Sequence, residues 1–167
     1  MTKKAWISAL MAVCLAVIVG YALAAWRTKE IDNEKFAVTF AREVERGAYK
    51  IVTTAELKVW IDQKKDMLIV DTNPEAGYKK QHIPGSVNLE IQRPEISKLD
   101  DKLKDDLLKV LGSDKNRIIV FYCGFTECTR SHNGAMWATR LGYTNAYRQP
   151  GGIKAWSDAA YPMESAK

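Results

Sequence analysis

An uncharged apolar run opens the chain and covers residues 5–26. Its length suits a helix that crosses a hydrocarbon core of roughly 30 Å. Trp6 and Trp26 bracket the run, at positions where interfacial aromatic residues are favoured. Two lysines before the run and small residues near its end also suit a signal sequence. Residues 1–26 are therefore predicted to be a transmembrane anchor, with a signal peptide as the alternative.

Both interpretations of this run place the rest of the chain across the membrane. The expected location is periplasmic or extracytoplasmic, tethered to the inner membrane when the helix is retained. Residues 27–34 are mostly charged or polar and predict a juxtamembrane linker. Apolar residues at helical spacing then predict an amphipathic helix over 35–46, which Gly47 ends. We expect this helix to pack on the domain behind it; the alternative is a helix that binds a membrane or a partner.

From residue 49 onward, short apolar runs alternate with helical patterns. Thr53 and Glu56 have the spacing of a capping box, which opens a helix after a short strand. Strands and helices in this alternation indicate a parallel α/β sheet within one domain, residues 49–167. A charged surface loop is expected over 91–103. Strands are expected at 49–52, 67–70, 87–89, 118–122 and 144–147, and helices at 54–64, from Pro74, around 107–111, from Ser131 and at 153–160.

The chemistry is concentrated where the 118–122 strand ends. Cys123 follows that strand directly and precedes a polar loop and a helix. Backbone N–H groups of such a loop, with the positive end of the helix dipole, favour a thiolate and bind anions. Arg130 adds a permanently charged donor fork that suits oxyanions. Cys123 is therefore predicted to be the nucleophile, with Arg130 as its catalytic partner.

Cys128 lies in the same loop and is also predicted to be catalytic. It could be a second thiol of the pocket, a resolving partner in a disulfide with Cys123, or the nucleophile itself. Ser131 is interpreted as the N-cap of the following helix. His132 is interpreted as a solvated residue of its first turn, with a modest contribution to the pocket as the alternative. The residues predicted to contact the substrate are Gly124, Phe125, Thr126, Glu127, Thr129 and Ser131.

The charge balance and the residue types of the chain argue against nucleic-acid binding and against a metal site. Outside residues 1–26 the chain carries 23 basic against 20 acidic side chains, without a basic stripe, so nucleic acid is not an expected partner. Cys14 lies in the apolar run, where a cysteine acts as a small hydrophobic residue. Only His82 and His132 could complete a metal site with the loop cysteines, so no metal is expected, and no cofactor is predicted.

Three separated motifs carry a family resemblance. They read VDTNPEAGYKKQHIPGSVNL at 70–89, IIVFYC at 118–123 and YRQPGGIKAW at 147–156. Together they resemble a single rhodanese-like sulfurtransferase domain. The resemblance implies a parallel five-stranded sheet with helices on both faces and a catalytic cysteine at Cys123. It also implies that sulfane sulfur moves from thiosulfate, polysulfide or a persulfide donor, through a cysteine persulfide, to a thiol or other acceptor.

The chain departs from the family pattern at two places. The family usually has an arginine two residues after the strand aspartate, whereas Asp71 is followed by Thr72 and Asn73. Arg130 lies seven residues beyond Cys123, where about five is usual. The longer loop resembles a subgroup of exported proteins with a second loop cysteine. Longer loops in the superfamily fit the phosphate or arsenate of related phosphatases and reductases, so the thiosulfate assignment depends on this loop.

Two other functions fit the same residues. The first is a thiol-redox enzyme or oxyanion reductase that cycles a disulfide between Cys123 and Cys128. The second is a non-catalytic docking module of a membrane complex, held by the anchor and the 35–46 helix. The expected partners are small sulfur-containing anions or persulfide-carrying proteins, the membrane through residues 5–26, and a membrane protein complex.

Overall fold

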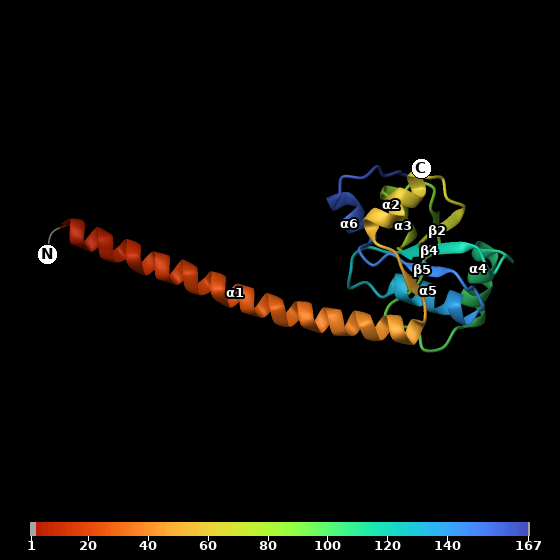
Figure 1. Cartoon of the computed structure of the whole chain (residues 1–167), viewed down its shortest axis with the longest axis horizontal. Coiled ribbons are helices and arrows are strands. Elements are labelled where there is room, and N and C mark those ends of the chain that lie inside the picture. Colours follow the sequence, from red (N-terminus) through yellow and green to blue (C-terminus); the bar gives the residue numbers. More distant parts are fainter. Residues whose placement is uncertain (1–2, 167) are drawn as a thin grey trace. The chain divides into compact units, whose positions relative to one another are not determined.

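The computed structural model describes residues 3–166, and the chain divides into two units, residues 1–41 and 42–167. One helix, α1 (Lys3–Gly47), includes residues 27–34, so the predicted linker is helical (Figure 1). Many side chains of the predicted anchor, 5–26, lie outside the described residues. Among the residues that the structure does describe, no helix combines the length and the hydropathy of a membrane span.

The end of α1 lies where the sequence predicts it, for a steric reason. A Cβ atom on Gly47 would stand 2.3 Å from the ring of Tyr49, so a larger residue would displace that ring. Ala48 adopts a left-handed backbone with φ 50°, and its N–H group donates to the carbonyl of Val44. The chain therefore turns sharply out of the helix and into the first strand.

The second unit contains a parallel five-stranded sheet, as the sequence predicts. Its order is β1-β5-β4-β2-β3, and every neighbouring pair is parallel (Figure 1). The central strand is β4, which pairs with β2 on one side and β5 on the other. The strands are β1 (Lys50–Ile51), β2 (Met67–Asp71), β3 (Val87–Asn88), β4 (Ile118–Tyr122) and β5 (Ala146–Arg148).

Four helices connect these strands and a fifth follows β5, close to the predicted positions. The capping box is present, because the Thr53 hydroxyl accepts from the Glu56 N–H group while the Glu56 carboxylate accepts from the Thr53 backbone. The predicted cap at Ser131 is wrong: the N-cap residue is Thr129, whose side chain makes no capping bond. The helices are α2 (Thr54–Asp62), α3 (Glu75–Lys80), α4 (Asp101–Leu111), α5 (Arg130–Arg140) and α6 (Gly152–Asp158).

Alternate residues of β4 supply two hydrophobic cores. Ile119 and Phe121 pack with apolar residues of α4 and α5 on one face of the sheet. Val120 and Tyr122 pack with residues of α2 and α6 on the other face. Successive side chains of a strand point to opposite faces, so a strand buried on both sides reads as one continuous apolar run.

The segment predicted as a surface loop, residues 91–103, is partly buried and tied to α5. Ile91 is buried in the first core. The side-chain amide of Asn133 donates to the carbonyls of Gln92 and Pro94, and its oxygen accepts from the N–H group of Ile96. The position of this loop matters because it also carries Glu95, whose carboxylate contacts Arg46 of α1.

Candidate active site

Three central strands of the sheet end beside one another. Asp71 ends β2, Cys123 follows β4 and Arg148 ends β5. Because the strands are parallel, these residues meet at the carboxyl edge of the sheet, where α/β proteins bind ligands. The loop 123–129 then connects this edge to the first turn of α5.

The first turn of α6 holds the start of this loop. The N–H group of Ile153 donates to the Cys123 carbonyl at 2.8 Å, and that of Lys154 donates to the Gly124 carbonyl at 3.0 Å. Gly152 precedes them with φ +63°, and a Cβ atom there would stand 2.4 Å from the Cys123 carbonyl oxygen. Only glycine allows this close approach of two backbone segments.

The side chain of Cys123 is fully buried and meets mainly oxygen atoms. Its sulfur lies 3.3 Å from the Cys128 carbonyl oxygen and 3.2 Å from the Ser131 hydroxyl. A carbonyl oxygen accepts a hydrogen bond from a thiol but offers nothing to a thiolate. Burial raises the pKa of Cys123 well above the usual cysteine value, and the neighbouring Cys128 thiolate raises it further.

Cys128 has the anion-stabilising surroundings that the sequence predicts for Cys123. A hydrogen bond from the Cys123 thiol lowers the pKa of Cys128 to about 5, although burial acts against it. The backbone N–H groups of Arg130 and Gly124 lower this pKa as well. The surroundings of the two sulfur atoms therefore favour the thiolate at Cys128 over the thiolate at Cys123.

Arg130 supplies the permanent positive charge of the loop. Its Nη1 atom lies 3.7 Å from the Cys128 sulfur, and its side chain also lowers the pKa of Cys128. Its Nε atom is buried and has no hydrogen-bond partner within residues 3–166. A guanidinium with an unused donor beside a thiolate can donate a hydrogen bond to one oxygen of an anionic substrate.

Ser131 links the thiol pair to a residue that the sequence analysis overlooks, Arg148. The Nε atom of Arg148 donates to the Ser131 hydroxyl at 3.2 Å, and Nη2 donates to the Cys128 carbonyl at 3.2 Å. Its Nη1 atom contacts the Glu43 carboxylate of α1 at 2.5 Å and the Tyr49 hydroxyl at 3.1 Å. Burial lowers the pKa of Arg148, but Tyr49 and Glu43 raise it by more, so the guanidinium stays charged.

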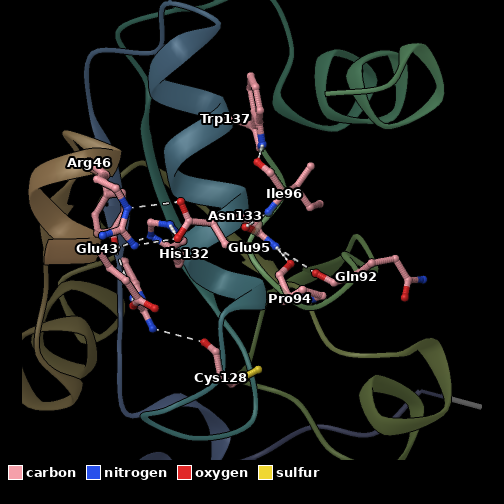
Figure 2. A network of polar contacts seen from close by, with 12 residues as sticks. Glu43, Arg46, Gln92, Pro94, Glu95, Ile96, Cys128, His132, Asn133 and Trp137 are labelled. Carbon is pink, nitrogen blue, oxygen red and sulfur yellow. Dashed lines mark hydrogen bonds and ion pairs between the residues drawn. The ribbon is translucent and has the colours of Figure 1, made fainter. Parts of the chain in front are cut away.

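His132 is buried, which corrects its interpretation as a solvated residue. Its Nδ1 atom shares a hydrogen bond of 2.9 Å with the Tyr49 hydroxyl. Its Nε2 atom lies 3.5 Å from the carboxylate of Glu95, which in turn accepts from Arg46 of α1 (Figure 2). Burial lowers the pKa of His132, so the ring is neutral at neutral pH.

The other predicted substrate-contacting residues fall into two groups. Phe125, Thr126 and Glu127 are exposed at the tip of the loop, where the Cys128 N–H group closes a turn on the Phe125 carbonyl. Gly124 and Thr129 lie deeper, and the Thr129 hydroxyl is buried without a partner among residues 3–166. Their contact with a substrate stays a prediction.

The Asp71 region shows the result of the missing family arginine. Asp71 is buried, and burial raises the pKa of its carboxyl group. One of its oxygens accepts from the Asn73 N–H group, and Asn88 holds the adjacent backbone by donating to the carbonyls of both residues. Within the described residues, no cation forms a salt bridge with Asp71. An asparagine pair therefore organises this turn.

Fold and site together define a class, a parallel α/β domain with a loop at its carboxyl edge that carries two buried thiols. Residues 53–159 match the family model of the rhodanese-like domain. The chain belongs to the rhodanese-like domain family. No curated protein matches the chain.

Solved structures show the same fold. A protein from Bacillus halodurans is 22% identical with a TM-score of 0.56, and the match covers 80% of this chain and 85% of that one. A rhodanese-like domain from Anabaena is 21% identical with a TM-score of 0.56, covering 69% and 78%. A Rhodopseudomonas palustris protein described as a possible tyrosine phosphatase is 23% identical with a TM-score of 0.53, covering 73% and 91%.

The close contact between Gly152 and the start of the 123–129 loop can be tested with the variant Gly152→Ala. The new Cβ would combine left-handed strain with overlap on the Cys123 carbonyl, so we expect the free energy of unfolding to fall by about 3 kcal/mol or more. Gly85→Ala is the control, because Gly85 has a similar φ of +73° and open space around it. It should cost only about 1–2 kcal/mol. Equal losses in urea unfolding would contradict a steric role for Gly152.

The charge distribution of the thiol pair can be measured by the ultraviolet absorbance of thiolates in a Cys14→Ser background. We expect one thiolate to appear with a midpoint near pH 5 and a second only at strongly alkaline pH. Cys123→Ala removes the hydrogen bond that stabilises the Cys128 thiolate, so the acidic midpoint should rise. Cys128→Ala should abolish it. An acidic transition that survives in Cys128→Ala would assign the thiolate to Cys123 instead.

Proposed function

We propose that this protein is a sulfurtransferase that moves sulfane sulfur through a cysteine persulfide in the 123–129 loop. The observation that carries the proposal is the buried pair of cysteines in one loop, with the Arg130 guanidinium 3.7 Å from the Cys128 sulfur. A rhodanese-like fold is a sulfurtransferase-type scaffold, which agrees with this chemistry. Substrates would be small sulfur-containing anions or persulfides of partner proteins.

In the proposed reaction the persulfide forms on Cys123. The Cys123 thiol passes its proton to the Cys128 thiolate and attacks the outer sulfur of thiosulfate or of a polysulfide. The sulfur–sulfur bond of the donor breaks, and the leaving group is sulfite or a shortened polysulfide. An acceptor thiolate then takes the outer sulfur, and Cys123 returns as a thiolate. Arg130 would hold the anionic end of the donor, and the loop N–H groups would stabilise the persulfide anion.

Mass spectrometry of the loop peptide tests this proposal directly. After the Cys14→Ser protein reacts with thiosulfate or polysulfide, the 118–130 peptide should gain the mass of one sulfur atom. Cys123→Ser should lose the adduct, and Cys128→Ser should form it more slowly because the proton acceptor is gone. A full adduct in Cys123→Ser would place the persulfide on Cys128. Absence of any adduct in the parent protein, with every donor, would reject sulfur transfer.

Contact between the two cysteines supports a second candidate, a thiol-redox enzyme or oxyanion reductase. The Cys123 sulfur lies 3.3 Å from the Cys128 carbonyl oxygen, and both cysteines are free. Two adjacent thiols can close a disulfide when an oxidised substrate removes two electrons and the protons leave to solvent. Such a cycle requires both thiols, so Cys128→Ser would abolish turnover with an oxyanion substrate. Sulfur transfer would only slow.

The same protein is proposed to be tethered to the inner membrane on its extracytoplasmic side, within a membrane protein complex. The support is the uncharged run at 5–26 with its flanking tryptophans. The full chain should stay in membranes after an alkaline carbonate wash, and its domain should be digested by protease added outside spheroplasts. A protein that washes off, or that only lysis exposes to protease, would contradict the tether or its orientation.

A further inference from the structure

Arg148 is a fully buried cation next to the thiol loop. Its side chain has no exposed surface, and four groups from separate parts of the chain accept its hydrogen bonds. Removing a guanidinium from water is costly unless a counter-charge and acceptors replace the water. The counter-charge is Glu43, which is also buried. The pair joins residues 105 positions apart in the sequence.

Two of the four acceptors belong to the thiol site. Arg148 holds the Cys128 carbonyl, and that oxygen also faces the Cys123 sulfur. It holds the Ser131 hydroxyl as well, which touches the same sulfur. The guanidinium is therefore linked to the Cys123 sulfur through two successive hydrogen bonds, by way of the Ser131 hydroxyl. It also fixes the backbone that carries Cys128.

The neutralising partner lies outside the part of the chain that defines the family. The family match begins at residue 53, whereas Glu43 and Tyr49 precede it. Arg46, one helical turn after Glu43, binds Glu95 on the loop that Asn133 of α5 fixes (Figure 2). The last turns of α1, residues 42–47, thus contact Arg148 through a buried ion pair and the 91–103 loop through an exposed one.

We propose that Arg148 is a positioning residue of the thiol loop, and that Glu43 sets how much of its positive charge the thiol pair experiences. The proposal rests on the loop being the reactive site, but its test requires no sulfur donor. The charged groups around the thiol pair and Arg148 include Arg130 on the positive side and Glu43 and Glu95 on the negative side. The neutral side chains of His132 and Tyr49 lie between Glu95 and Arg148.

The test uses the full chain with Cys14→Ser and Cys123→Ala, so that thiolate absorbance reports Cys128 alone. Glu43→Gln leaves the Arg148 charge uncompensated, which favours the thiolate, so the midpoint should fall by about half a pH unit or more. Arg148→Gln removes the cation and leaves the Glu43 carboxylate, so the midpoint should rise by a similar amount. Glu43→Gln combined with Arg148→Gln should lie between the two single variants.

The opposite directions separate a charge effect from mere loosening of the fold. A purely structural role would let water into the loop in both single variants and move both midpoints toward the ordinary cysteine value. Shifts in the same direction would therefore overturn the proposal, as would unchanged midpoints. Arg46→Gln is the matched control, because it removes the exposed ion pair of α1 and leaves the buried one. Arg46→Gln should leave the midpoint unchanged. Glu43→Asp keeps the negative charge, so its midpoint should lie between those of the parent protein and the Glu43→Gln variant.

If Arg148→Gln fails to fold, Glu43→Gln still decides the proposal. That variant keeps the size and an acceptor oxygen at position 43, so only the charge changes. Circular dichroism measured at each pH is the check that the chain remains folded across the transition. A lowered midpoint supports the proposal, and a raised or unchanged midpoint overturns it. Sulfur transfer is judged separately by the loop-peptide mass, so failure of one conclusion does not decide the other.

Discussion

The fully buried guanidinium of Arg148 determines how the segments around the thiol loop are arranged. Buried guanidinium groups need acceptors on several sides, and Arg148 finds them in a carboxylate, a phenol, a serine hydroxyl and a backbone carbonyl. Each acceptor comes from a different segment. Satisfying one side chain therefore aligns the end of α1, the residue before β1, the thiol loop and the first turn of α5.

The thiol loop shows how one proton can be divided between two similar groups. Cys123 and Cys128 have the same chemistry, but one sulfur faces a carbonyl oxygen and the other receives backbone N–H groups and Arg130. Burial and hydrogen-bond geometry together thus raise the pKa of Cys123 and lower that of Cys128. This division supports either persulfide formation or a disulfide cycle, which is why the substrate, rather than the pair itself, separates the two functions.

Local patterns in the sequence were sufficient for the fold. Continuous apolar runs predicted β2 and β4, and the capping box predicted the start of α2, because strand burial and helix capping depend on neighbouring residues. The strand, thiol, loop and helix order also predicted that Cys123, Cys128 and Arg130 lie together at the end of β4, as they do. These predictions used interactions within a few residues of one another.

The electrostatics of the site depend on contacts that no local pattern contains. Glu43 falls within the amphipathic helix predicted over 35–46, and His132 was interpreted as a solvated first-turn residue, yet both are buried. Arg148 offered one signal, a charged residue at the end of a short strand in a buried parallel sheet, which requires a counter-charge. Nothing in the sequence named that counter-charge, and the orientation of two sulfur atoms is likewise a product of tertiary packing.

The position of Glu43 also bears on where this domain can be cut. A fragment beginning at residue 53, the first position of the family match, would retain Arg148 and lose both Glu43 and Tyr49. It would also lose β1 and Val52 of the second core, and it would keep the other four strands of the sheet. Such a fragment would carry an unbalanced cation beneath its thiols. The boundary of the family match and the boundary of the hydrogen-bond network around Arg148 are therefore different places in this chain.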